Sequence, residues 1–311
     1  MGGRSGSTRT NSTPADRTTG VGVTIDRSRY ELEVDEQFEA DDLDERLWLR
    51  HYLPHWSSRE ASAARFDVGG GELRLRIDAD QPPWNPEHDG WLRVSGLQTG
   101  QFAGTLGSGI GQLQFAPGLT VREEQPSRAL YTPRYGLFEI RLRGIADPAN
   151  MVALWMIGYE DAPERSGEIL ICEVFGREMS DGSARIGVGV RPWADPSLSD
   201  GFEFVQVSLD AREPHWYAAE WMPDRVRFYI DEREVKVVEQ SPAYPMQFML
   251  SLYEFADGPE PASPRDAYPK VAIVERFRGW RPVTGPGARE RTGPAIGRTS
   301  STTGPSGTPP V

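Results

Sequence analysis

Alternation of apolar and polar residues with a period of two is the feature that most limits what this chain can fold into. In residues 71–77, Leu73, Leu75 and Ile77 alternate with charged side chains, and the ranges 135–143 and 225–231 repeat the pattern. This alternation is typical of antiparallel strands that bury one face. No stretch keeps an apolar stripe of helical period for three turns. The chain is therefore predicted to be all-β.

Three further stretches are apolar at nearly every position, which indicates central strands with both faces covered. They are residues 151–157, 168–175 and 246–255, and Asp-Gly or Gly-rich turns punctuate the chain between strands. A short helix is predicted only for 41–52. Many short strands without helices between them predict a sandwich or jelly roll of two antiparallel sheets.

The two ends of the chain differ in composition from its middle. Residues 1–22 and 285–311 consist largely of Gly, Ser, Thr, Pro and Arg, and they carry few apolar side chains. Such segments cannot bury enough surface to offset the entropy lost on ordering, so both are predicted to be disordered tails. The remaining residues, 23–284, are enough for a single domain with one large core.

The charge balance narrows the classes of partner. The chain has 46 acidic residues against 34 basic ones, for a formal net charge of −12 at pH 7. Because both tails are slightly basic, the domain between them is more acidic still. This charge disfavours nucleic acids and anionic membrane surfaces, whereas a neutral polysaccharide or oligosaccharide is not repelled. We expect a monomer.

Other ligand and targeting signals are weak in this sequence. The single cysteine, Cys172, excludes an intrachain disulfide, and the four histidines lack the spacing of a zinc site. We predict neither a metal nor a cofactor. No apolar run is long enough to span a bilayer, and the first 20 residues lack the apolar stretch of a secretory signal. Localisation is left open: cytoplasmic by default, or exported by a route that the sequence does not show.

Two glutamates stand in the otherwise apolar stretch from Ser166 to Gly176. Glu168 and Glu173 are five positions apart, so a regular strand would point them to opposite faces. A single β-bulge between them would return both to one face, because it adds one residue to the strand. Buried carboxylates are costly unless they find partners or face a cavity. The spacing alone therefore permits two interpretations: a pair of catalytic carboxylates, or two structural glutamates that each pair with an arginine.

Several motifs, in the same order along the chain, resemble glycoside hydrolase family 16. They are Tyr135-Gly-Leu-Phe-Glu-Ile-Arg141, Met151-Val-Ala-Leu-Trp-Met-Ile157, Gly167-Glu-Ile-Leu-Ile-Cys-Glu173 and the hairpin from His215 to Asp231; the ranges 38–48 and 271–280 match the first and last strands more loosely. The resemblance covers about residues 35–281. It implies a concanavalin A-like β-jelly roll with substrate lying in a cleft across the concave sheet.

The resemblance also implies roles for the two glutamates. Glu168 takes the place of the nucleophile and Glu173 that of the general acid/base, in a glycosidase that hydrolyses or transfers β-linked polysaccharide such as β-glucan with retention of configuration. Leu170 stands where the family has an aspartate, and an apolar neighbour should raise the pKa of Glu168. The alternative is a catalytically silent jelly roll that binds carbohydrate.

Aromatic side chains are the candidates for sugar contacts, because their faces stack on pyranose rings. Trp193 follows Arg191-Pro192 at the start of a polar loop and is the strongest candidate. Trp84 and Trp91 flank a Pro-rich loop that could rim the same cleft. Trp155 and Tyr253 lie in central strands, where packing in the core is an equally good explanation for Trp155.

Overall fold

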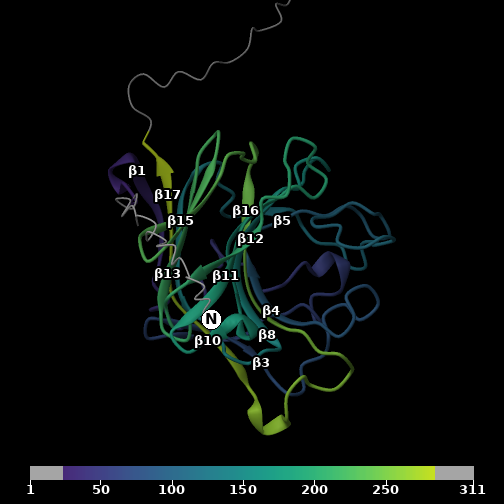
Figure 1. Cartoon of the computed structure of the whole chain (residues 1–311). Helices are drawn as coiled ribbons and strands as arrows, with labels where there is room; N and C mark the ends of the chain where they lie inside the picture. Colours follow the sequence, from purple (N-terminus) through teal and green to yellow (C-terminus); the bar gives the residue numbers. More distant parts are fainter. Residues whose placement is uncertain (1–23, 284–311) are drawn as a thin grey trace, which may run out of the picture.

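The computed structural model describes residues 24–283, and the two predicted tails, 1–22 and 285–311, lie outside the described residues. Its strands form two large antiparallel sheets that lie face to face (Figure 1), as the alternation predicted. The predicted fold class, an all-β jelly-roll sandwich, is confirmed. In residues 24–283, no helix is long and apolar enough to cross a membrane.

The first sheet, here called sheet A, has the strand order β15-β14-β13-β7-β17-β3-β2, and β1 also pairs with β17. Its strands are β1 (Tyr30–Glu36), β2 (Arg65–Gly69), β3 (Glu72–Ile77), β7 (Gly136–Arg143), β13 (His215–Trp221), β14 (Val226–Ile230), β15 (Arg233–Val238) and β17 (Lys270–Pro282). The stretches that alternate in the sequence, β3, β7 and β14, all lie in this sheet.

The second sheet, sheet B, has the order β10-β11-β9-β8-β16-β4, with β12 paired to β11. Its strands are β4 (Arg93–Gln98), β8 (Asn150–Gly158), β9 (Glu168–Phe175), β10 (Met179–Ser180), β11 (Ser183–Arg191), β12 (Glu203–Val207) and β16 (Met246–Glu254). The pair β5 (Gly100–Gln101) and β6 (Arg128–Ala129) stands apart, as do the short 3₁₀ turns η1 (Arg27–Arg29), η2 (Pro54–Trp56), η3 (Gly176–Glu178) and η4 (Arg265–Ala267).

The main core fills the space between the sheets. Phe248 of β16 packs edge-on against Phe138 and Phe277 of sheet A, with ring centroids 5.0 Å apart in both pairs. Ile169 and Cys172 of β9 point into this core, and burial raises the pKa of the Cys172 thiol to about 12. Cys172 is therefore a small buried apolar residue rather than a nucleophile.

A second cluster lies on the outer face of sheet B. Trp155, Leu170 and Tyr253 contribute to it from the central strands, and loop residues such as Trp56 and Trp84 complete it. The loops over this face come from 37–64, 78–92 and 102–127 and gather on one side of the molecule (Figure 1). The apolar character of β8, β9 and β16 on both faces follows from this arrangement, because each face packs against a different cluster.

The helix predicted for 41–52 is absent, and that prediction was wrong. The backbone makes one turn, in which the amides of Leu47 and Trp48 both donate to the Asp44 carbonyl at 2.9 Å. Leu49 then pairs with Gln98 as an isolated bridge. Trp48 is buried in the main core, so tertiary packing rather than helical propensity decides the conformation of this segment.

Candidate active site

A β-bulge in β9 brings Glu168 and Glu173 to the same face of sheet B. On β8, Trp155 opposes Leu170, and the residue before it, Leu154, opposes Cys172. Ile171 therefore has no partner on β8 and is the extra residue of the bulge. The pairing with β11 shifts at the same place. Ile169, Ile171 and Cys172 face the main core, and Leu170 joins the outer cluster. Leu170 therefore lies between the two glutamates on the face that points away from sheet A.

Glu168 is almost fully buried at the start of β9. Burial, together with the charge of Glu173, raises the pKa of its carboxyl to about 7. Two contacts act in the other direction: the Trp193 indole N–H donates to Glu168, and Arg191 lies close enough to stabilise its charge. The sequence predicted that an apolar site would raise the pKa of Glu168, and the pKa is raised in the structure.

Glu173 lies near the middle of the same face, beside two arginines. Burial raises the pKa of its carboxyl, and the charges of Arg191 and Arg177 partly offset that effect. Arg191 Nη1 is 3.9 Å from Glu173 Oε1. The opposing residue on β11 is Gly187, where a Cβ would lie only 2.8 Å from the ring of Phe202. The missing side chain lets Phe202 fold over the sheet next to Glu173.

Both arginines lie over phenylalanine rings. The Arg191 guanidinium lies 4.0 Å from the ring centroid of Phe202, and that of Arg177 lies 4.1 Å from Phe175. Stacking fixes the arginine planes while leaving their N–H edges free to donate. This patch places two positive charges beside Glu173, which the acidic overall composition did not predict.

Aromatic residues form the floor of the site. Trp155 Nε1 donates to the Tyr253 hydroxyl at 3.1 Å, and Tyr253 is also hydrogen-bonded to Tyr52. Tyr52 is close enough to Glu168, and Tyr253 to Glu173, for each carboxylate to raise the pKa of its tyrosine. The two tyrosines therefore keep their protons and can donate hydrogen bonds.

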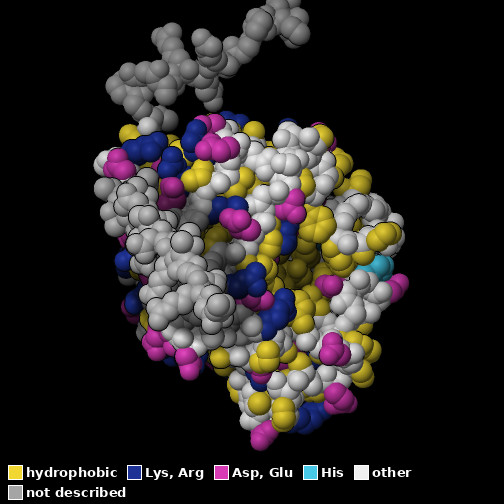
Figure 2. All heavy atoms as spheres, viewed as in Figure 1, with side chains coloured by type: hydrophobic (Ala, Val, Ile, Leu, Met, Phe, Trp, Pro, Cys, Tyr) yellow, Lys and Arg dark blue, Asp and Glu magenta, His cyan; other side chains and the backbone are white. Residues whose placement is uncertain are grey.

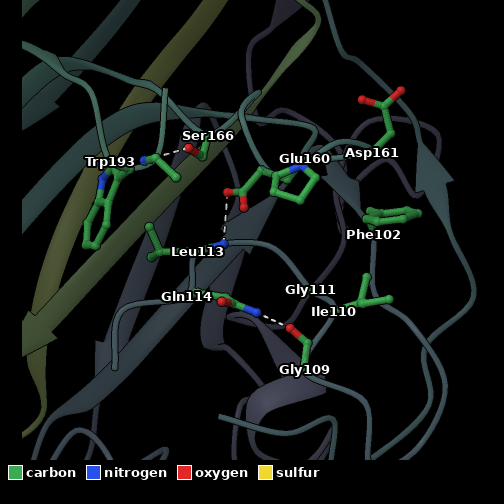
Figure 3. A pocket seen from close by; sticks show the side chains of 12 residues that line it. Phe102, Gly109, Ile110, Gly111, Leu113, Gln114, Glu160, Asp161, Ser166 and Trp193 are labelled. Carbon is green, nitrogen blue, oxygen red and sulfur yellow. Dashed lines mark hydrogen bonds between the residues drawn. The ribbon is translucent and has the colours of Figure 1, made fainter. Parts of the chain in front are cut away.

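A pocket of about 370 Å³ lies at the end of β8 and β11, next to Glu168. Trp193 and Ser166 form one side, and Phe102, Ile110 and Leu113 from the loop before β6 form much of the rest (Figure 3). Figure 2 shows a hollow on this side of the molecule with a mainly hydrophobic floor and charged side chains at its rim. A site of this size and character is typical of small-ligand pockets.

A third carboxyl group, Glu160, faces this pocket. Its Oε1 accepts from the Leu113 amide at 2.9 Å, and burial raises the pKa of the carboxyl to about 8. Glu168 contributes to that increase, which shows that the two carboxyls lie near each other. Glu160 is not part of any motif, and only the fold of the β8–β9 loop brings it to the site.

The five aromatic residues that the sequence predicted as substrate contacts differ in how exposed they are. Trp193 is 44% exposed and contacts Glu168, which suits a stacking platform. Trp155 and Tyr253 lie beside the glutamates but are 6% and 4% exposed. Trp91 is 40% exposed but lies outside the pocket beside Glu168.

Trp84 requires a correction. Its side chain is 1% exposed and packs edge-on against Tyr52 at 4.8 Å, while its indole N–H donates to Asp89. No face of this ring is open to a sugar. Trp84 instead supports Tyr52 from behind, so the prediction that it contacts substrate was wrong.

Among residues 24–283, no group of three or more His, Cys, Asp or Glu side chains is arranged to hold a metal ion. The chemistry of the site therefore has to be derived from its carboxyl groups, arginines and aromatic rings. A buried pair of carboxyls on one face, in reach of each other's charge, is suited to acid/base and nucleophilic catalysis.

Known proteins share the fold of this chain. The model of the glycosyl hydrolases family 16 matches residues 125–266, a range that contains both glutamates and the strands from β7 to β16. This part of the chain is similar to glycoside hydrolase family 16. Members of this family act on O-glycosyl bonds. No curated protein matched the chain by sequence.

Solved structures of this family share the fold. A GlcNAcα1-4Gal-releasing endo-β-galactosidase from Clostridium perfringens superposes with a TM-score of 0.69 and 29% identity, over 83% of this chain and 64% of the other. This chain thus spans slightly less than two thirds of that protein. Laminarinases from Flavobacterium sp. UMI-01 and Rhodothermus marinus superpose with a TM-score of 0.56 each, at 15% and 17% identity. They cover 81% and 82% of this chain, and 100% and 98% of their own.

Replacing Trp193 should separate its two contributions. Trp193→Ala should raise KM for a β-glycan by about tenfold, because a stacked ring is worth roughly 1 kcal/mol. It should also move the rise of activity to higher pH, because Glu168 loses a donor that stabilises its charge. Trp193→Phe should restore KM but not the pH profile. Steady-state kinetics from pH 5 to 9 test this, and a Phe variant identical to wild type would contradict the hydrogen-bonding role.

Proposed function

We propose that this protein is an endo-acting glycosidase that cleaves β-linked polysaccharide, by hydrolysis or transfer, through a retaining mechanism with two glutamates. The observation that carries the proposal is the bulge at Ile171, which places Glu168 and Glu173 on one face of the sheet. A purely structural pair of glutamates needs no such bulge. The match of residues 125–266 to a hydrolase family and the aromatic floor beside both carboxyls add support.

In the first step, the Glu168 carboxylate attacks the anomeric carbon while the Glu173 carboxyl protonates the departing glycosidic oxygen. The bond to the leaving sugar breaks, and an ester forms between the sugar and Glu168. In the second step, Glu173, now a carboxylate, accepts a proton from water, and the resulting hydroxide displaces Glu168 from the anomeric carbon. Two displacements at this carbon retain its configuration.

The surroundings of each glutamate affect the protonation state that its role requires. Glu168 must be ionised to attack, and the Trp193 N–H and Arg191 both stabilise its charge. Glu173 must hold a proton, and burial favours the neutral carboxyl. When Glu168 becomes an ester its charge disappears, which lowers the pKa of Glu173 and prepares it to accept a proton from water.

The substrate is proposed to be a β-linked glucan or galactan. The family resemblance of the sequence points to β-glucans, and two of the similar structures are laminarinases. The similar structure with 29% identity is an endo-β-galactosidase. The arginines beside Glu173 can donate N–H hydrogen bonds to ring hydroxyls of either sugar.

Activity should rise with pH through about 7. The free protein must lose the proton of Glu168, whose pKa is raised to about 7, so kcat/KM should fall about tenfold for each pH unit below that value. Reducing-sugar release from laminarin, lichenan and a β-galactan between pH 4.5 and 9 measures the profile. A rise complete by pH 5 would contradict this assignment. Glycan binding without cleavage at any pH would favour the silent carbohydrate-binding alternative.

A further inference from the structure

The pocket next to Glu168 has two features that a smooth polysaccharide cleft does not need. First, its volume of about 370 Å³ is near the low end of small-ligand sites, roughly 300 Å³, so it suits one sugar residue. Second, three of its residues have a positive φ although none is glycine: Glu160 at 57°, Leu113 at 53° and Trp193 at 45°. Left-handed conformations at such residues cost free energy and gather at functional sites.

The walls of the pocket are mostly apolar. Phe102, Ile110, Leu113 and Pro163 contribute carbon surface, and the Trp193 ring borders the side nearest Glu168 (Figure 3). Ile110 is 58% exposed, which is unusual for a large aliphatic side chain in a protein with an extensive core. An unsubstituted hexose has few carbon groups that would use this surface, since hydroxyls cover most of its ring.

Glu160 is the buried acidic group of this pocket. Its side chain is about nine-tenths buried, and one carboxyl oxygen is held by the Leu113 amide. Because burial raises the pKa of this carboxyl to about 8, it carries a proton at neutral pH. A protonated carboxyl is a hydrogen-bond donor as well as an acceptor, so the pocket offers a donor close to apolar carbon.

We propose that this pocket is a subsite for a sugar bearing an acetamido group, an N-acetylhexosamine, at one end of the glycan bound in the active site. The inference rests on the proposed function, because it assumes that glycan occupies the face beside Glu168. The acetamido carbonyl accepts from Glu160, and the methyl group packs against Leu113 and Ile110. The Trp193 ring stacks on the sugar.

Other sugar substituents match the pocket less well. A uronic acid would place a negative charge among the apolar walls of the pocket, where it loses hydration, and near the acidic Asp161. A 6-deoxy sugar has the methyl group but no carbonyl oxygen beside it to accept from Glu160. A plain hexose leaves the apolar wall covered by hydroxyls. Among these substituents, the acetamido group is the one that joins a carbonyl acceptor to a methyl group.

The test is a binding measurement that needs no catalysis. Methyl N-acetyl-α-glucosaminide and methyl α-glucoside are titrated against the full chain by NMR. We expect the acetamido sugar to bind at least tenfold more tightly, with the acetyl methyl protons receiving the strongest saturation transfer from the protein. Equal affinity for the two glycosides would overturn the inference.

Matched variants locate the binding site. Ile110→Gln should weaken binding of the acetamido sugar about tenfold, whereas Leu106→Gln, at a 63% exposed aliphatic residue of the same loop outside the pocket, should not. Glu160→Gln keeps a donor and should retain affinity within about threefold, whereas Glu160→Leu should lose it. Thermal unfolding confirms that each variant is folded. Binding unaffected by Ile110→Gln and Glu160→Leu would overturn the inference.

These outcomes are separate from those that test the glycosidase. Cleavage of β-glycans with no preference for the acetamido sugar would leave the proposed function standing and remove the subsite. Preferential binding of the acetamido sugar without any cleavage would keep the pocket assignment and remove the hydrolase.

Discussion

Glu168→Gln and Glu173→Gln should each lower cleavage of a β-linked glycan by roughly a thousandfold while leaving oligosaccharide affinity within a few-fold of wild type. The amide of glutamine cannot attack the anomeric carbon and cannot transfer a proton, and these contributions are worth about 10²–10⁴ in rate. Binding survives because the substitution keeps the shape of the side chain. Activity by reducing-sugar release and affinity by calorimetry measure the two effects.

A matched control comes from the opposite sheet. Glu275 in β17 pairs with Arg141 and Arg143 on sheet A, so Glu275→Gln removes a carboxylate far from the proposed site. Its activity should equal that of wild type. If both active-site variants were as active as this control, the two glutamates would be structural.

Leu170→Asp should raise hydrolysis below neutral pH by about tenfold. Leu170 is 2% exposed and lies between the glutamates on the outer face of β9, so the new carboxyl would join them. A second carboxylate alone would raise the pKa of Glu168, but paired carboxyls can share one proton. If the new aspartate keeps that proton and donates a hydrogen bond to Glu168, the Glu168 carboxylate is stabilised. The rise of activity then moves to lower pH.

The substitution should also lower stability, because a buried leucine side chain leaves the outer cluster. Reducing-sugar release at several pH values and urea unfolding of wild type and variant give both results. A wild type that is active but loses activity on this substitution would show that the site is adapted to leucine. Asparagine has a shape similar to that of aspartate but no titrating proton. The variant Leu170→Asn therefore distinguishes proton sharing from polarity alone.

The strands and the two glutamates could be predicted from the sequence because both depend on local pattern. Alternation in 71–77 determines which side chains of β3 face the core, and apolar residues on both faces mark β9 as central. The bulge was required if Glu168 and Glu173 were to share a face. Its location at Ile171 could not be predicted, because it depends on pairing with β8 and β11.

The surroundings of the glutamates could not be predicted, because they come from loops and neighbouring strands. Arg191 reaches Glu173 only through the pairing of β11 with β9, and Glu160 reaches the pocket through the β8–β9 loop. The only sequence signal for Arg191 was its place just before Trp193. Trp84 misled for the opposite reason: a tryptophan in a Pro-rich loop can be buried when the loop folds back over the sheet.

The most direct test of the central claim is to trap the glycosyl ester. A 2-deoxy-2-fluoro β-glycoside with a good leaving group slows both steps but slows the release of the ester more, because fluorine destabilises the positively charged transition state. After incubation and proteolysis, mass spectrometry should find the fluoroglycosyl group on the peptide that contains residues 168–173, with the fragment ions placing it on Glu168. Label on Glu173 or Glu160, or no label while the protein cleaves substrate, would contradict the proposed mechanism.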